Sequence, residues 1–216
     1  MKTAIVIGAT GLVGKHITQK LLNDNRYEKV KVFVRRPVGI SNPKLEEHIV
    51  DFGKIELWKN QMTGDELYSA MGTTIKKAGS KEAQYKIDFT YQYEAANAAS
   101  ESGVKKYLLV SSMGANSKSS NFYLQMKGSL NEKVQQLNFN QIFIFRPSIL
   151  VGERSEKRFG ESLGIKIIGT ITKIIPALKK YRPIEASQVA EAMIKSANKN
   201  LADKIKVYHP EEIFEI

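Results

Sequence analysis

Short, uniformly apolar runs and longer amphipathic stretches alternate along this chain, separated by polar turns. The first run, residues 4–7, is continuously apolar, as expected of a parallel strand covered on both faces. Residues 12–22 follow closely, and their apolar side chains recur at helical spacing. Because this succession of strand and helix repeats, the pattern predicts an α/β fold with a doubly wound, mostly parallel sheet.

The same pattern places the remaining elements in chain order. Strands are expected at residues 30–34, 48–52, 68–74, 106–110, 141–150 and 206–209. Helices are expected at residues 85–102, 122–137 and 187–198, the last with Ser187 as its N-cap. The amphipathic tail, residues 211–216, is expected to dock on the sheet. No linker or repeat divides the sequence, which predicts one domain over residues 1–216, with a small C-terminal substrate-side region at about residues 151–185.

Three glycines spaced by three lie in the turn between the first strand and the first helix. Gly8 lets the chain turn sharply, Gly11 lets backbone N–H groups approach a phosphate, and Gly14 lets the helix pack close to the sheet. The unpaired N–H groups of a helix that begins here suit a pyrophosphate. The expected phosphate-binding residues are Gly8, Thr10, Gly11, Leu12, Val13 and Gly14. The spacing differs from the usual Gly-x-Gly-x-x-Gly, and glycines that serve packing alone are the alternative.

Composition narrows the function classes. The 216 residues include no cysteine and three scattered histidines, so disulfides, thiolate catalysis and a metal site are not expected. The net charge of +11 raises the alternative of nucleic-acid binding, but the lysines are spread along the chain without a DNA- or RNA-reading motif, so no nucleic-acid partner is expected. The absence of a signal peptide and of a long apolar run predicts a cytoplasmic protein without membrane association.

Two arginines follow the second strand, where a dinucleotide-binding fold meets the adenosine ribose. They lie about 20 residues after the glycine turn, the usual position of the residue that contacts the 2′-oxygen. A carboxylate there would accept from a free 2′-hydroxyl, whereas Arg35 and Arg36 offer planar donors to a 2′-phosphate. The pair therefore indicates NADP(H) as the cofactor. The alternative is that the arginines only solvate the strand end.

Two further pairs of residues follow the next two strands. Asp51 is suited to accept from the adenine amino group, and Phe52 is suited either to pack beside that ring or to fill the core. Gly72 and Thr73 end the fourth predicted strand, whose carboxyl end faces the cofactor cleft in a doubly wound sheet. They are expected to contact the diphosphate or the nicotinamide ribose.

Tyr123 and Lys127 are four residues apart and share one face of a predicted helix. In this arrangement an ammonium stabilises a phenolate and holds a ribose hydroxyl, while the phenol moves a proton to or from an alcohol oxygen. Ser112, or alternatively Ser111, follows the fifth strand and would hydrogen-bond the same oxygen. The three groups predict hydride transfer to or from a small carbonyl or alcohol. A solvated helix face is the alternative interpretation of the pair, and the phosphate-binding turn upstream argues against it.

Several segments together resemble the atypical short-chain dehydrogenase/reductases, most closely the oxidoreductases related to the Tat-interacting protein. The segments are the glycine turn, the Arg-Arg pair, Met-Gly-Thr-Thr-x-x-x-Ala-Gly-Ser at residues 71–80, Ser-Ser-Met-Gly-Ala at 111–115, and Asn-Phe-Tyr-Leu-Gln-Met-Lys-Gly at 121–128. The resemblance implies a Rossmann fold, NADP(H), Tyr123 with Lys127 as the catalytic pair, and Ser112 as their partner. It also implies that Pro147, Ser148 and Ile149 border the nicotinamide.

The function expected from these residues and this resemblance is that of an NADP(H)-dependent oxidoreductase. It would act, as a monomer or homodimer, on a small carbonyl or alcohol. The wider group also includes regulators that bind the cofactor without turnover, so a redox sensor acting through a protein partner is the alternative. Gln188 stands where the family usually has aspartate, a departure that concerns helix capping and pocket closure.

Overall fold

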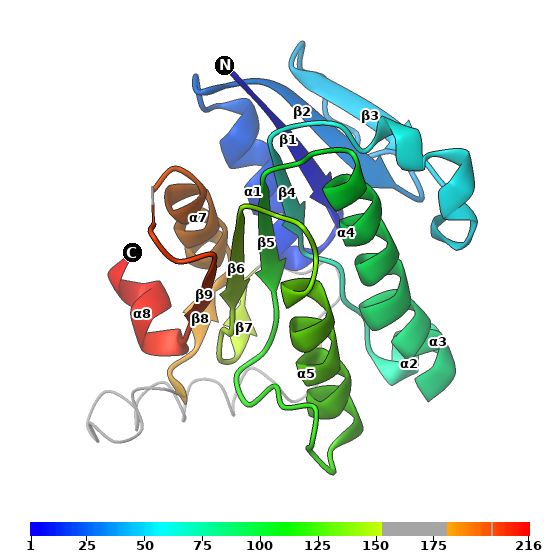
Figure 1. The fold of residues 1–216 in the computed structure, drawn as a ribbon, viewed down its shortest axis with the longest axis vertical. Coiled ribbons are helices and arrows are strands. Elements are labelled where there is room, and N and C mark those ends of the chain that lie inside the picture. The colour runs from blue at the N-terminus through cyan, green and yellow to red at the C-terminus, as the bar shows by residue number, and fades with distance from the viewer. Residues whose placement is uncertain (153–180, 200) are drawn as a thin grey trace.

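Seven parallel strands form the central sheet of the protein (Figure 1). They are seen in a computed structural model, which describes residues 1–152, 181–199 and 201–216. Across the sheet the order is β3 (Leu45–Ile49), β2 (Tyr27–Val34), β1 (Lys2–Ile7), β4 (Glu66–Ser69), β5 (Lys106–Val110), β6 (Gln141–Phe145) and β9 (Ile205–Tyr208). The predicted α/β fold with a doubly wound, parallel sheet is confirmed.

Helices cover both faces of this sheet (Figure 1). One face carries α1 (Leu12–Leu22) and α7 (Ala186–Ala197), and the other carries α4 (Tyr91–Glu101) and α5 (Phe122–Gln135). The smaller elements are α2 (Ile75–Ala78), α3 (Lys81–Tyr85), α8 (Pro210–Glu215), and the paired short strands β7 (Leu150–Val151) and β8 (Ile184–Glu185). These elements form a single domain. Most of the substrate-side region expected at residues 151–185 lies outside the described residues.

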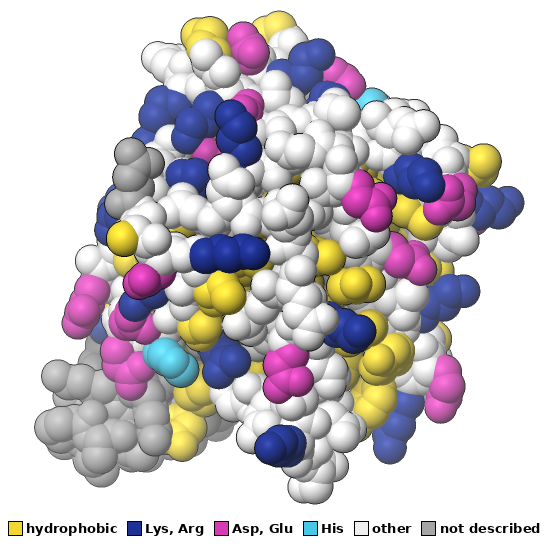
Figure 2. Space-filling view, viewed as in Figure 1, with side chains coloured by type: hydrophobic (Ala, Val, Ile, Leu, Met, Phe, Trp, Pro, Cys, Tyr) yellow, Lys and Arg dark blue, Asp and Glu magenta, His cyan; other side chains and the backbone are white. Residues whose placement is uncertain are grey.

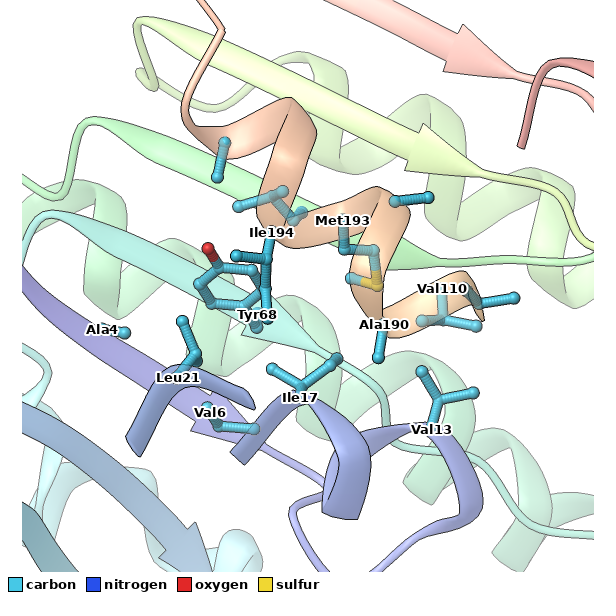
Figure 3. Packing of buried hydrophobic residues seen from close by; sticks show 14 of the residues in the cluster. Ala4, Val6, Val13, Ile17, Leu21, Tyr68, Val110, Ala190, Met193 and Ile194 are labelled. Carbon is cyan, nitrogen blue, oxygen red and sulfur yellow. The ribbon is translucent and has the colours of Figure 1, made fainter. Parts of the chain in front are cut away.

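Strand β1 supplies side chains to both cores. Ala4 and Val6 face α1 and α7, while Ile5 and Ile7 belong to the core beneath α4 and α5, and all four are fully buried. This explains why the run is apolar without alternation. Figure 3 shows the first core, in which the helices contribute Val13, Ile17, Leu21, Ala190, Met193 and Ile194. Burial of each large aliphatic side chain contributes about 1.5–3 kcal/mol to stability.

The order of the strands reverses between β1 and β4. From β1 the chain proceeds to β2 and β3 on one side, whereas β4, β5 and β6 extend the sheet on the other. Ile7 at the end of β1 pairs with Phe33 of β2 and with Ser69 of β4. In open parallel sheets such a reversal leaves a crevice at the carboxyl ends of the strands, where ligands bind. The fold therefore directs attention to the segments that follow β1 and β4.

Strands β3 and β4 both begin and end earlier than the pattern predicts. The third strand is predicted at 48–52, but β3 spans Leu45–Ile49, because an edge strand is half exposed and tolerates charged residues such as Glu46. The fourth strand is predicted at 68–74, but β4 spans Glu66–Ser69. A glutamate can begin this buried strand because three neighbouring side chains bind its carboxylate.

The helical segment before β5 also begins earlier than predicted. In place of the helix predicted at 85–102, α2 is followed by a helix that runs without a break through α3, a π turn (Lys86–Thr90) and α4. The Ser80 hydroxyl begins it by accepting from the Ala83 N–H at 3.1 Å. Polar residues of this helix that bond to β4 and to the segment after it, described below, obscured its helical period.

The boundaries near the C-terminus differ in smaller ways. The sixth strand ends at Phe145 instead of residue 150, because Pro147 has no N–H for a ladder. Helix α7 begins at Ala186 with Glu185 at the N-cap, so Ser187 does not have the predicted capping role. The tail docks as α8 against α7 and β9, with Ile213 buried in the core.

Charged side chains are mixed on the molecular surface. On the face seen in Figure 2, lysines and arginines are spread over the surface with acidic side chains among them. Lys29 pairs with Glu46 at 2.8 Å, and Lys206 pairs with Glu212 at 2.7 Å. Within the ranges that the structure describes, no helix has the length and apolar character needed to cross a membrane.

A buried carboxylate joins the amino ends of several elements. Glu66 is 1% exposed, and its oxygens accept from Lys2 Nζ at 2.7 Å, from the Tyr27 hydroxyl at 2.7 Å and from the Tyr68 hydroxyl at 2.8 Å. Asn198 Nδ2 donates to the Tyr27 hydroxyl at 2.9 Å. Burial, followed by the nearby charge of Glu66, raises the pKa of both tyrosines, which therefore remain protonated donors at neutral pH.

Removal of this carboxylate is expected to destabilise the whole domain. Glu66→Ala removes the carboxylate that accepts from two buried hydroxyls and from Lys2, and it should lower the free energy of unfolding by about 3 kcal/mol. Urea denaturation measures the loss. The control is Glu28→Ala, an exposed position of β2, where we expect a change below about 0.5 kcal/mol. Equal effects of the two substitutions would contradict a structural role for the Glu66 cluster.

Candidate functional site

The glycine turn joins β1 to α1 through close backbone contacts. Gly8 has a φ of 82°, and its carbonyl accepts from the Gly11 N–H at 2.9 Å. A Cβ on Gly14 would lie 2.0 Å from the Gly8 oxygen, so only glycine allows α1 to approach the turn this closely. Helix α1 begins at Leu12, and no side chain caps its first N–H groups. The turn therefore presents free backbone donors and a positive helix end, which suit an anion.

The segment after β4 lies against this turn. A Cβ on Gly8 would lie 2.6 Å from the Ala70 carbonyl, which means that the two backbones are in contact. Gly72 is exposed, and Thr73 is held from behind, because its N–H donates to Asp88 Oδ1 at 2.8 Å and its carbonyl accepts from Gln84 Nε2 at 3.1 Å. The structure thus brings the predicted pair Gly72 and Thr73 next to the glycine turn.

A cavity of about 240 Å³ lies beyond the carboxyl end of β2. It gathers three residues that the sequence predicts for the cofactor, namely Arg35, Asp51 and Phe52. The remaining lining residues come from the helix after the β4 segment and are Ala83, Lys86, Ile87 and Tyr91. Arg36 is exposed but does not line this cavity. Lys86, which sequence reasoning missed, therefore joins Arg35 as a second cation of the cavity.

Phe52 and Asp51 line this cavity, the first as a buried and the second as an exposed residue. Phe52 is 4% exposed and packs against Trp58 and Tyr91, with ring centroids 5.3 and 5.9 Å apart. Phe52 is therefore a core residue that also lines the cavity, and its packing beside an adenine ring stays a prediction. Asp51 is exposed, and its Oδ1 accepts from the Gly53 N–H at 2.9 Å. A larger cavity of about 400 Å³ lies beside β3. Asp51 lines it together with Trp58, but none of the other residues predicted to bind the cofactor does so.

Tyr123 and Lys127 lie in the first two turns of α5, which follows the loop after β5. Asn121 begins the helix, because its Oδ1 accepts from the Leu124 N–H at 3.1 Å. Tyr123 is 37% exposed, whereas Lys127 is 3% exposed. The Tyr123 side chain is thus accessible to a substrate, whereas Lys127 is buried. Gly128 allows this arrangement, since a Cβ there would lie 2.2 Å from the backbone of Asn116 in the loop after β5.

The two serines after β5 have different surroundings. Ser111 is buried, and its hydroxyl contacts the Asn131 amide at 2.9 Å, in the amide orientation that also gives Asn131 bonds to the Lys127 carbonyl and to Arg146. Ser112 is half-buried, and its hydroxyl donates to the Met113 carbonyl at 3.2 Å. Burial lowers the pKa of Arg146 in the same cluster. Ser111 therefore belongs to a structural network, and Ser112 lies on the more open side.

The segment predicted to border the nicotinamide is hydrogen-bonded to the loop after β5. The Pro147 carbonyl accepts from the Met113 N–H at 2.9 Å. The Ser148 hydroxyl donates to the Arg182 carbonyl, and the Ile149 carbonyl accepts from the Ile184 N–H at 2.9 Å. Pro147, Ser148 and Ile149 therefore connect the loop after β5 to the short β7–β8 pair.

Sequence reasoning missed three buried polar residues behind the site. They are Gln84, Asp88 and Gln92, which are spaced by four along the helix. Gln84 and Asp88 bond to the segment after β4, and Gln92 bonds to β4 and to the Asp88 carbonyl. Ser69 Oγ donates to Gln92 Oε1 at 2.7 Å, and Gln92 Nε2 donates to the Asp88 carbonyl at 2.6 Å. Their regular spacing on a helix that otherwise packs against the sheet is the sequence signal that could have identified them.

Comparisons with known proteins identify the family and the relatives to which this chain is similar. A family model described as NAD(P)H-binding matches residues 8–141. Protein FMP52, mitochondrial, from Candida albicans is 35% identical over 94% of this chain and 91% of its own length. The rat protein HTATIP2 is 33% identical over 79% of this chain and 72% of its own length, which confirms the resemblance to the Tat-interacting-protein branch.

A solved structure shares the fold at low sequence identity. A short-chain dehydrogenase/reductase superfamily protein from Agrobacterium tumefaciens with bound NAD superposes with a TM-score of 0.71 and 12% identity, over 96% of this chain and 77% of that one. The superposition shows a shared fold, and the family model describes the chain as NAD(P)H-binding.

The relatives contradict the expected cytoplasmic location. The FMP52 proteins of Candida albicans, Aspergillus niger and Scheffersomyces stipitis are named mitochondrial. The prediction is wrong because it rested only on the absence of a signal peptide and of a long apolar run. Neither pattern identifies a mitochondrial protein, because targeting signals are recognised by receptors and do not depend on the fold.

Because α1 lies so close to the glycine turn, one methyl group added at Gly14 is expected to destabilise the protein strongly. Gly14→Ala should lower the free energy of unfolding by about 3 kcal/mol, because the added Cβ overlaps a backbone oxygen that cannot move away. Thermal and urea unfolding measure it. Gly72→Ala is the matched control, since a Cβ there would meet nothing closer than 3.8 Å. Similar stabilities of the two variants would refute the packing argument.

Proposed function

Because this chain belongs to the NAD(P)H-binding family, we propose that it is an NADP(H)-dependent oxidoreductase of the short-chain dehydrogenase/reductase type. Its substrate would be a small carbonyl or alcohol. One observation carries the proposal: the glycine turn, the Arg35 cavity, the β4 segment and the Tyr123–Lys127 pair all follow carboxyl ends of parallel strands, so they share one edge of the sheet.

The residues at this edge fit a dinucleotide. Gly8 and Gly14 leave no room for a Cβ, and free N–H groups at the start of α1 suit the pyrophosphate, with Thr10, Leu12 and Val13 completing the turn. Gly72 and Thr73 would contact the diphosphate or ribose from the opposite side. Asp51 and Phe52 would hold the adenine in the 240 Å³ cavity. Pro147, Ser148 and Ile149 would border the nicotinamide.

Arg35 carries the preference for a 2′-phosphate. Its planar guanidinium lies in the cavity and can bind phosphate oxygens in pairs, and Arg36 beside it adds positive charge. Lys86 supports the same preference from the opposite wall of the cavity. No carboxylate occupies the position directly after β2 where one would select a free ribose hydroxyl.

Tyr123, Lys127 and Ser112 would act together on the substrate oxygen. The bound nicotinamide supplies the hydride to the carbonyl carbon in the reductive direction. Tyr123 donates its phenolic proton to the oxygen as negative charge develops there, and the enclosed ammonium of Lys127 stabilises the resulting phenolate. Ser112 orients the oxygen with its hydroxyl. Ser111 is a weaker choice for that role because its hydroxyl is bonded to Asn131.

Arg35→Gln is expected to change the choice of cofactor. Loss of a charged bond to the 2′-phosphate should weaken NADPH binding about tenfold to a hundredfold and leave NADH binding within about twofold. Titration with each cofactor, followed by energy transfer from protein fluorescence, measures both constants. Lys105→Gln removes one charge at the other edge of the sheet and should leave both affinities unchanged. Equal losses for NADPH and NADH would remove Arg35 from this role.

Tyr123→Phe is expected to separate binding from turnover. The variant should bind NADPH like the wild type and reduce aldehydes, ketones or quinones about 10²–10⁴ times more slowly, because no group can supply the proton. The assay is NADPH consumption over a panel of these substrates. Tyr85→Phe, which removes a hydroxyl from an exposed tyrosine of α3, is the control. Undiminished turnover in Tyr123→Phe would reject the assignment, and binding without any turnover in the wild type would favour a cofactor-sensing regulator.

A further inference from the structure

The π turn in the helix after β4 brings Lys86 and Tyr91 onto one face of that helix. The turn spans Lys86–Thr90, and the Tyr91 N–H donates to the Lys86 carbonyl, which is a bond between residues five apart. In a regular α-helix, residues five apart point in directions about 140° from each other. The extra residue of the turn therefore aligns two side chains that an α-helix would separate. Turns of this kind are frequent at functional sites.

The two aligned side chains are in contact. Lys86 Nζ lies over the Tyr91 ring, 5.7 Å from its centroid, at a distance where the face of an aromatic ring attracts a cation. The same ring packs against Phe52, a buried core residue, with the ring centroids 5.9 Å apart. Tyr91 thus connects an exposed lysine to the core. A lysine held against a ring loses less freedom on binding an anion than one that moves freely in water.

Both side chains line the 240 Å³ cavity beyond the carboxyl end of β2. Arg35 follows β2, whereas Lys86 and Tyr91 belong to the helix, so cations from two elements meet at one cavity. In the described part of the chain, neither Arg35 nor Lys86 forms an ion pair. Asp51 is the carboxylate of the cavity, and its Oδ1 accepts from the Gly53 N–H. Two cations without an ion-pair partner suit a group with two negative charges, such as a phosphate monoester.

We propose that Tyr91 is a positioning residue that holds the Lys86 ammonium for the 2′-phosphate of NADP(H). The inference rests on the proposed function and deepens it. Arg35 binds the phosphate oxygens through its planar guanidinium, and Lys86 adds a point charge from the helix. The Tyr91 ring acts through this lysine and not on the phosphate itself. Because NADH has no 2′-phosphate, the ring contributes to NADPH binding alone.

Two substitutions of Tyr91 test the role of the ring, with binding to the full chain measured by calorimetry. Tyr91→Leu removes the aromatic face and should weaken NADPH binding about fivefold, with NADH binding within about twofold of the wild type. Tyr91→Phe keeps the ring and should bind both cofactors within about twofold of the wild type. Equal losses for NADPH and NADH in Tyr91→Leu would overturn the proposal, as would a Tyr91→Phe variant that binds NADPH as weakly as Tyr91→Leu.

A double-mutant cycle tests whether the effect of Tyr91 passes through Lys86. Lys86→Met should weaken NADPH binding about tenfold, and in that background Tyr91→Leu should cause a further loss below about twofold. A fivefold loss in both backgrounds would overturn the positioning role. Lys81→Met is the matched control, because Lys81 also lies 5.7 Å over an aromatic ring, that of Phe122, but does not line the cavity. It should leave both affinities within about twofold.

The outcomes separate this inference from the proposed function. A wild type that binds neither cofactor would refute the proposed function and the inference with it. NADPH binding that Tyr91→Leu leaves unchanged would refute the inference alone. If circular dichroism shows that Tyr91→Leu does not fold, Tyr91→Met replaces it in the cycle, because an unbranched side chain still fills the space beside Phe52. The same loss of NADPH affinity is expected, and an unchanged affinity would again overturn the role of Tyr91.

Discussion

The close approach of helix α1 to the turn after β1 is the constraint on which the rest of the structure depends. The Gly14 backbone lies so near the Gly8 carbonyl that no side chain fits between them, and Gly8 in turn contacts the backbone after β4. These contacts fix the first helix, the first strand and the strand across the reversal in one arrangement. The crevice at the carboxyl edge of the sheet exists because they are held at that spacing.

Different elements then supply the chemistry of that edge. The turn offers backbone donors, the end of β2 offers Arg35, and α5 offers the exposed Tyr123 and the buried Lys127. Each group is common on its own. They become a site because parallel strands deliver all of their carboxyl ends to one side of the sheet, while polar side chains from the α3–α4 helix brace the segment after β4.

The two edges of the sheet have opposite roles. At the amino edge, Glu66 is saturated by Lys2, Tyr27 and Tyr68, so its charge is compensated and serves stability. At the carboxyl edge, within the residues that the structure describes, no side chain caps the N–H groups at the start of α1, and no acidic side chain forms an ion pair with Arg35 or Lys86, although Asp51 lines the same cavity. These positive groups suit an anionic ligand and accord with membership of the NAD(P)H-binding family.

The sequence by itself determined the sheet type and the glycine turn and predicted most of the candidate site, because each depends on local spacing: continuous apolar runs, glycines three apart, and a tyrosine four residues before a lysine. Only the tertiary structure decided that Arg35, and not Arg36, lines the cavity, that Lys86 joins it, and that Ser111 is tied to Asn131 while Ser112 is not. It also revealed Asp88 and the early start of β3 and β4. These features arise from contacts between residues far apart in the chain, which local periodicity does not encode.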